Sequence, residues 1–198
     1  RSYSPDYLTP ESGASWRPRS SPEAIVGPLA RVANGGSLTI RGFGDIENRG
    51  GAGLIVGTGG EVVVHDSIFS GFQDPQSPPI STLDGASGTR IEVVECGFDD
   101  CARGVFLANV AGVTETVARN STFENLSSHP IEFRTDVGEH SLYVEDCGFS
   151  FNSDHPIRLY AFEATSPSDE IRAEATFSRC RFVGGGAERW AASSWCPL

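Results

Sequence analysis

The chain of 198 residues contains no lysine, so its 15 basic residues are all arginine. The acidic residues number 26, and the formal net charge is −11. Duplex nucleic acid is bound through a basic patch that matches its phosphates, so we expect no nucleic-acid partner. An anionic polysaccharide would also require a local arginine cluster to overcome the overall field. An acidic composition without lysine is typical of a salt-adapted organism, but it also follows from GC-rich codon usage, and both origins stay open.

The chain also lacks methionine and any run of 18 apolar residues. The second absence excludes a transmembrane helix. Because the chain starts with Arg1 and has no Met, we expect a processed or excised product, and a removed secretion signal is consistent with this start. We therefore expect an extracellular, cell-surface or virion-surface protein.

A repeat of 25–26 residues runs through most of the chain. An apolar residue marks one strand of the repeat at Val105, Ile131 and Ile157, which are 26 residues apart each time. The series extends back to Ile80 and Ile55 in steps of 25. A fixed period of this size indicates stacked structural units.

A second motif runs in phase with the first and ends in phenylalanine. Each copy has an apolar residue, two mostly polar residues, a small Ser or Cys, one spacer and Phe. The small residues are Ser67, Cys96, Ser121, Cys147 and Cys180, and the phenylalanines are Phe69, Phe98, Phe123, Phe149 and Phe182. The alternation of small residue and Phe indicates a strand with one buried face, and the polar pair indicates a bend before it. The second polar residue is Asp66, Glu95, Asn120, Asp146 or Arg179, and Asp and Asn tolerate left-handed backbone at such corners.

Three short strands in each repeat predict a coiled arrangement. Hairpins could not keep the same register in every copy, whereas a coil lets each strand pair with its equivalent about 4.8 Å away. The sequence therefore predicts an all-β, single-stranded parallel β-helix of about six coils with a period of about 25–26 residues. Residues 36–190 resemble the right-handed parallel β-helix superfamily, which includes pectate lyases, polygalacturonases and phage tailspikes.

The chain divides into three predicted regions. Residues 1–30 are rich in Pro and Ser and show no periodicity, so we expect an extended N-terminal arm. Residues 31–190 form the β-helix, with an insertion over 162–171. Residues 191–198 form a C-terminal cap.

Charged and aromatic residues gather on the outward side of the third predicted strand. Together they form a candidate glycan-binding surface of Arg103, Phe106, His129, Glu132, Arg134, His155, Arg158 and Tyr160. The alternative is a solvated face on which Glu132 and Arg158 merely offset each other's charge, at under about 1 kcal/mol. His129 and His155 lie on adjacent coils, but the only local third ligand is Asp154, so we expect no metal site.

The superfamily resemblance implies a polysaccharide lyase or glycosidase as one alternative. The catalytic candidates are Glu132, Asp154 and Arg158, of which the two carboxylates suit the spacing of a glycosidase pair. The calcium-binding Asp cluster and arginine base of pectate lyases do not map onto this chain, and the three-Asp pattern of polygalacturonases is absent. We expect no cofactor, with calcium only if the chain is lyase-like.

Two kinds of covalent modification are suggested by the sequence. Five cysteines leave an odd one, no Cys-x-x-Cys pair indicates zinc, and Cys180 with Cys196 is the candidate disulfide. Asn120 and Asn125 each begin a glycosylation pattern, although left-handed corner geometry alone also explains Asn120.

We expect a structural or adhesive β-helix module that assembles with itself or with other subunits through its N-terminal arm or an open coil end. This expectation follows from the missing catalytic motif and the short coil. A lyase or glycosidase and a non-catalytic glycan-binding domain remain the alternatives, with polysaccharide as the partner.

Overall fold

The computed structural model describes residues 14–16, 28–42, 44–47, 51–150, 152, 157–161, 171–184 and 193–195, and for 14–16, 135–136, 157–161, 171 and 193–195 only the backbone. The strands are β1 (Ala14–Trp16), β2 (Ala30–Val32), β3 (Ser37–Arg41), β4 (Asp45–Glu47), β5 (Leu54–Val56), β6 (Glu61–His65), β7 (Ile68–Ser70), β8 (Ile80–Thr82), β9 (Arg90–Val94), β10 (Gly97–Asp99), β11 (Val105–Arg119), β12 (Thr122–Glu124), β13 (Ile131–Glu145), β14 (Gly148–Ser150), β15 (Ile157–Ala161), β16 (Ile171–Ser178), β17 (Arg181–Val183) and β18 (Ser193–Trp195). All pairings between them are parallel. The described residues include no helix.

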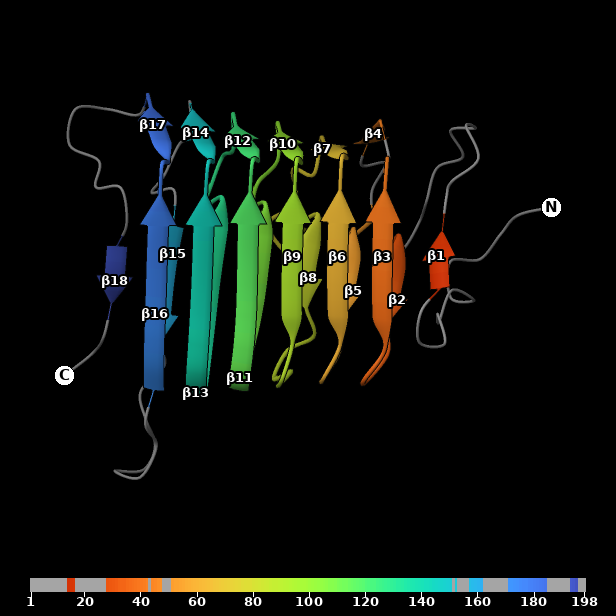
Figure 1. Ribbon diagram of the computed structural model, residues 1–198, viewed down its shortest axis with the longest axis vertical. Coiled ribbons are helices and arrows are strands. Elements are labelled where there is room, and N and C mark those ends of the chain that lie inside the picture. The colour runs from red at the N-terminus through yellow and green to blue at the C-terminus, as the bar shows by residue number, and fades with distance from the viewer. Residues whose placement is uncertain are drawn as a thin grey trace.

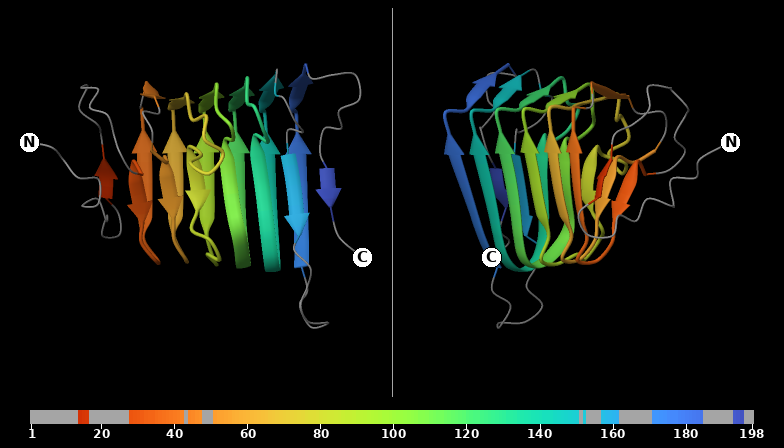
Figure 2. Two further views of the ribbon diagram at one scale, coloured as in Figure 1. Left: turned by 180° about the vertical axis from the view of Figure 1, so that it is seen from behind. Right: turned by 45° about the vertical axis from the view of Figure 1, so that its right-hand side comes forward.

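These strands form three faces of a parallel β-solenoid, as Figures 1 and 2 show. Face 1 contains β3, β6, β9, the ends of β11 and β13, and β16. Face 2 contains β2, β5, β8, the starts of β11 and β13, and β15. Face 3 is the six-stranded sheet of β4, β7, β10, β12, β14 and β17. The predicted all-β parallel coil is therefore confirmed.

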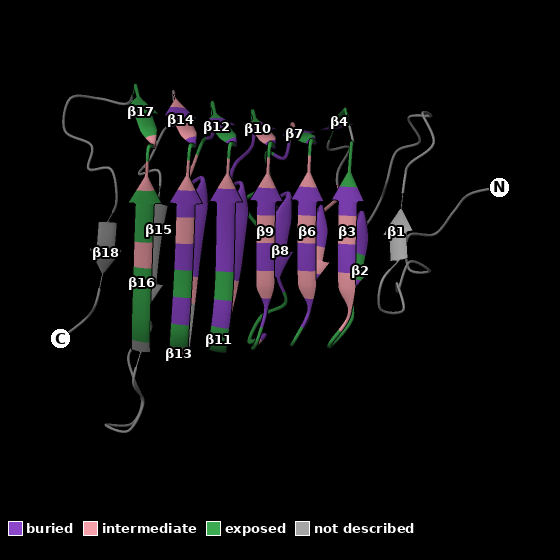
Figure 3. Cartoon of the chain, in the orientation of Figure 1, coloured by how far each residue is buried: buried purple, intermediate pink, exposed green. Residues whose placement is uncertain are grey.

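Stacked phenylalanines fill the core beneath face 3. The column consists of Phe69, Phe98, Phe123, Phe149 and Phe182. Neighbouring rings lie 4.7–5.2 Å apart between centroids, with interplanar angles of 1–10°. The first four rings are at most 2% exposed. The predicted Phe column is confirmed. Figure 3 shows buried and intermediate residues alternating along β3, β6 and β9.

The corner between faces 1 and 3 adopts left-handed backbone in successive turns. The residues concerned are Asp66, Glu95, Asn120, Asp146 and Arg179, with φ of 48–56°. The following Ser or Cys donates a hydrogen bond to the carbonyl two residues earlier, from Ser67 to His65 (2.8 Å) and from Cys147 to Glu145 (3.3 Å), for example. The small residue therefore stabilises the bend, a role that the alternation of small residue and Phe does not reveal.

One position of the predicted core series is wrong. Leu54, not Ile55, is in register with Ile80 and is fully buried, whereas Ile55 pairs with Ser81 and is half-buried. Counting in equal steps shifted the series by one residue. Because side chains alternate between the two sides of a strand, this shift moves the residue from the inner to the outer side.

The predicted terminal regions are described only in part. Within the predicted arm, β1 pairs with β3, and within the predicted cap, β18 pairs with β15. Residues 162–170 of the predicted insertion lie outside the described part, and the region boundaries stay a prediction. No helix among the described residues is long and apolar enough to cross a membrane.

Candidate functional site

Part of the predicted glycan-binding surface does come together where β11 and β13 begin. Arg103 and Phe106 belong to one turn, and His129, Glu132 and Arg134 belong to the next. Phe106 and Glu132 are directly in register. Because the parallel pairing places equivalent residues of consecutive turns side by side, the repeat alone predicts this grouping.

The remaining predicted residues are not described to the same extent. Asp154 and His155 lie outside the described residues. For Arg158 and Tyr160 the backbone alone is described, in register with Glu132 and Arg134, respectively. Their contribution to binding or catalysis therefore stays a prediction.

Glu132 is the centre of a buried ion cluster. Its Oε2 lies 2.7 Å from Arg103 Nε, an ion pair outside hydrogen-bond alignment, and its Oε1 accepts a 3.0 Å hydrogen bond from Arg134 Nε. His129 Nδ1 lies 3.9 Å from the same Oε2. Both guanidinium groups also lie over the Phe106 ring, with Cζ 4.4 Å (Arg103) and 5.1 Å (Arg134) from its centroid. A single carboxylate thus joins two arginines from successive turns.

The cluster is an interior feature of the protein. Glu132 is 0% exposed, His129 4%, Arg103 6% and Phe106 8%. Only the side chain of Arg134 has substantial exposure, at 34%. A buried charge is tolerated when it is paired and hydrogen-bonded, and the two arginines provide this for the carboxylate. This position therefore differs from the open, solvated face that the sequence suggested.

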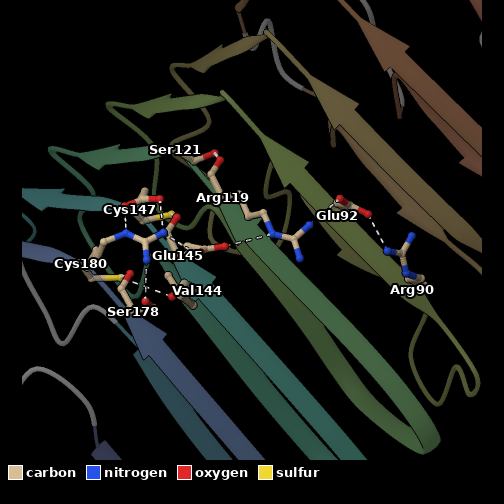
Figure 4. A network of polar contacts seen from close by, with 11 residues as sticks. Arg90, Glu92, Arg119, Ser121, Val144, Glu145, Cys147, Ser178 and Cys180 are labelled. Atoms are coloured by element: carbon tan, nitrogen blue, oxygen red, sulfur yellow. Dashed lines mark hydrogen bonds and ion pairs between the residues drawn. The ribbon is translucent and has the colours of Figure 1, made fainter.

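A second set of ion pairs lies in the open on the outward side of face 1 (Figure 4). Arg90 contacts three carboxylates, those of Glu61 (2.6 Å), Glu92 (2.6 Å) and Glu115 (2.8 Å). Arg119 continues the series to Glu92, at 3.3 Å. We call these five residues, together with Glu145, Asp146 and Arg179, the face 1 network.

The face 1 network continues across the next two turns. Arg119 lies 3.5 Å from Glu145, and Arg179 contacts both Glu145 (2.5 Å) and Asp146 (2.7 Å). The hydrogen bonds and charge of Arg179 hold the pKa of Asp146 below its usual value. The sequence interpretation missed this network, although opposite charges at matching outward positions of the repeat, such as Glu61 and Arg90, were a usable signal.

A shallow depression of about 320 Å³ lies beside this network, between β11, β13 and β16. Tyr143 forms one part of its lining, with Arg119 Cζ 5.4 Å from its ring centroid. The carboxylates of Glu115 and Glu174 flank Ser141 in the same register row. An aromatic ring with nearby hydrogen-bonding groups is the kind of lining that small-molecule and sugar sites use.

The described residues offer little support for metal binding or for a reactive cysteine. Among the described residues, no group of three or more His, Cys, Asp or Glu could hold a metal ion. Burial raises the pKa of Cys96 and Cys147 to about 11 and of Cys101 to about 12. These thiols stay protonated at neutral pH, so they are poor nucleophiles and poor metal ligands.

The modification candidates have different surroundings. Asn120 and Asn125 are both exposed at left-handed corners. The side-chain amide of Asn125 donates to Asp99 (2.8 Å). Cys180 has a free thiol in the structure, and Cys196 lies outside the described residues, so their pairing stays a prediction.

Searches of protein-family models, curated proteins and solved structures found no match to this chain. The fold and the contacts above are therefore the basis for assigning a function.

Proposed function

We propose that the chain is a rigid structural β-solenoid module of an extracellular, cell-surface or particle-surface assembly. Its contribution is geometric, because stacked turns form a stiff body that spaces or joins other components. This function does not require a reactive group, and it accommodates the high acidic charge as a means of solubility.

The observation that carries this proposal is the complete burial of Glu132. Glu132, like Arg158, belongs to both the glycan-binding and the catalytic predictions, and its carboxylate is instead occupied by Arg103 and Arg134. The cluster links consecutive turns on the outer side of face 2, while the Phe column links consecutive turns inside the core. These residues thus support a stacking role more directly than a ligand-binding role.

The test is a combined screen of the purified chain for turnover and binding of uronate-containing and neutral polysaccharides, with and without Ca²⁺. A structural module is expected to release no products, to bind no glycan saturably, and to resist proteolysis over residues 51–150. Cleavage that is lost in Glu132→Gln, in a variant that melts like the original chain, would instead support the pectate-lyase-like alternative.

Non-catalytic glycan binding is the second candidate, and the depression on face 1 supports it. Tyr143, Glu115 and Glu174 offer a ring and exposed carboxylate acceptors to sugar hydroxyls. Saturable binding that is abolished by Tyr143→Ala but retained by Tyr143→Phe would favour this candidate. Glu95→Gln, on an exposed corner outside the depression, is the matched control.

A further inference from the structure

Each end of the solenoid carries one extra strand, and the two extra strands lie on different faces. At the N-terminal end, β1 adds one strand beyond β3 on face 1, and no described strand lies beyond β2 or β4. At the C-terminal end, β18 adds one strand beyond β15 on face 2, and no described strand lies beyond β16 or β17. Figure 1 shows β1 and β18 at opposite ends of the molecule. Each end therefore carries one strand of an incomplete turn, which lies on face 1 at the N-terminal end and on face 2 at the C-terminal end.

Apolar side chains are exposed on the C-terminal faces that lack this extra strand. Phe177 of β16 is 37% exposed and Phe182 of β17 is 40% exposed. Their in-register neighbours in the preceding turn, Val144 and Phe149, are 0% and 2% exposed. In a solenoid such residues become buried when a further turn stacks on them.

We propose that β1 and β18 supply the face 1 and face 2 strands of one shared turn, which forms when a second copy of this chain stacks head to tail on the first. The inference rests on the proposed structural function, and it identifies the partner as a second copy of the same chain. β1 of one copy pairs with β16 of the preceding copy, and β18 of the preceding copy pairs with β2 of the next. All strand pairings within the chain are parallel, so this stacking keeps every strand in the same direction.

The register within the chain predicts which residues meet at this junction. Ile40 and Phe177 occupy the same column at the two ends of face 1, through the successive pairings of β3, β6, β9, β11, β13 and β16. Trp16 is in register with Ile40, so it takes the position between Ile40 of its own copy and Phe177 of the other copy. On face 3, Asp45 and Arg181 occupy the same column at opposite ends, so the junction brings opposite charges towards each other.

A second copy is the partner because the two extra strands complement each other and belong to one chain. A head-to-tail contact of this kind does not close on itself, so it produces open filaments rather than a fixed dimer. Each copy carries a net charge of −11, which opposes association at low ionic strength. Added salt screens this repulsion and is expected to promote filament growth.

The backbone identifies a residue of β1 that faces the junction. Alternate residues of a parallel strand direct their backbone groups to opposite neighbours. On face 1, the N–H of Glu61 donates to Gly36 of the preceding turn, and Val63, two residues later, points the same way. Ser15 is in register with Thr39, which is in register with Val63. The N–H of Ser15 is therefore directed away from β3, toward the neighbouring copy.

The same reasoning identifies a residue of β18. On face 2, the N–H of Val105 donates to Pro130 of the following turn, and Leu107 points the same way. Ser194 occupies the column of Leu107, through the pairings of β11, β13, β15 and β18. The N–H of Ser194 is directed away from β15. A proline at position 194 therefore removes a hydrogen-bond donor to the junction and leaves the donors to β15 in place.

The experiment is sedimentation velocity of the full chain over a range of protein and NaCl concentrations, with Ser15→Pro and Ser194→Pro as test variants. Ser15→Val and Ser194→Val keep the N–H and serve as controls. The original chain and both controls are expected to form species that grow with protein concentration, and each proline variant alone is expected to remain monomeric. In an equimolar mixture, the intact C-terminal end of the Ser15→Pro variant can pair with the intact N-terminal end of the Ser194→Pro variant. The other two ends of this pair each carry a proline, so the mixture is expected to form a 1:1 dimer and nothing larger.

Three results would overturn the inference, and the first two are failures to associate. One is a chain that stays monomeric at all concentrations and salt levels, and the other is a mixture of the proline variants that stays monomeric. A dimer that never grows would show a symmetric contact instead of a head-to-tail one and would also reject it. None of these results touches the structural function itself, which fails only if the polysaccharide screen detects turnover or glycan binding.

Discussion

The cluster around Glu132 and the face 1 network use the same chemical groups in opposite surroundings. In the cluster, one carboxylate with no exposure joins two arginines. In the network, Arg90 and Arg119 have side chains that are 37% and 41% exposed, and each contacts more than one carboxylate. Interactions in the open are screened by water and salt, whereas a buried charge depends entirely on its partners. The comparison teaches that residue type alone does not decide what an ion pair contributes.

The largest expected effect is the loss of the buried carboxylate. Glu132→Ala removes the only carboxylate that contacts Arg103 among the described residues, while the hydrogen bond from Arg103 to the Pro75 carbonyl remains. It should lower the free energy of unfolding by about 3–5 kcal/mol. Urea unfolding followed by circular dichroism measures this change. Glu92→Ala in the face 1 network is the matched control, and an equal loss in the two variants would break the distinction between the sites.

A buried imidazole provides a second contrast with the exposed groups. His140 is 3% exposed, and its Nδ1 lies 2.8 Å from Thr114 Oγ1. Burial lowers the pKa of His140 from 6.5. As the pH falls, His140 therefore takes up a proton in the unfolded chain before it does so in the folded chain, which favours unfolding. The stability that depends on neutral His140 is complete above pH 6.5 and declines below it.

The measurement is the melting temperature between pH 7.5 and 5.5 for the original chain and for His140→Gln. The original chain should lose more stability over this range than the variant. Parallel curves would show that His140 does not set the pH dependence.

A smaller effect is expected for the exposed network. Arg119→Ala removes two ion pairs, which at an exposed position should cost about 0.2–1 kcal/mol each. The loss should shrink at 1 M NaCl, where the screening length is about 3 Å, while the cost of Glu132→Ala should persist. Urea unfolding at both salt concentrations checks this, and a salt-independent cost for Arg119→Ala would contradict the assignment.

The smallest effect concerns Asp146 at the end of the network. Hydrogen bonds from Arg179 lower the pKa of Asp146 from 3.8, so its contribution to stability is present above that pH and is lost as the pH falls further. In Arg179→Ala the pKa of Asp146 should rise back toward 3.8. Titration of the carboxyl carbon by NMR measures the shift, and an unchanged pKa would remove Arg179 as its cause.

Much of the fold could be predicted because its physical causes recur at a fixed period. Phe98 and Phe123 are 25 residues apart in the chain and stack at 4.7 Å. Corner residues such as Asp66 and Asn120 could be predicted because short polar side chains tolerate left-handed backbone. Leu54 was missed because two adjacent apolar residues both fit the period, and only strand pairing shows which one faces inward.

The sequence predicted that several outward residues lie close together, but it did not predict what surrounds them. Their role in binding or catalysis stays a prediction. Phe106 and Glu132 are in register in consecutive turns, and Arg103 contacts both of them. Their burial could not be predicted, because a pattern that distinguishes the two sides of a strand says nothing about what covers the outer side. The face 1 network was missed for a related reason. Apart from Arg90 and Glu92, its partners lie 25–34 residues apart and meet only after the turns have stacked.

The amino-acid sequence alone determined the solenoid, the position of its bends and the aromatic core, because these depend on local periodicity and on the repetition of similar turns. The tertiary structure decided which outward groups became buried, which charges paired across turns and where each terminal strand pairs. These properties depend on contacts between segments distant in the chain, and a period does not encode how such segments cover one another.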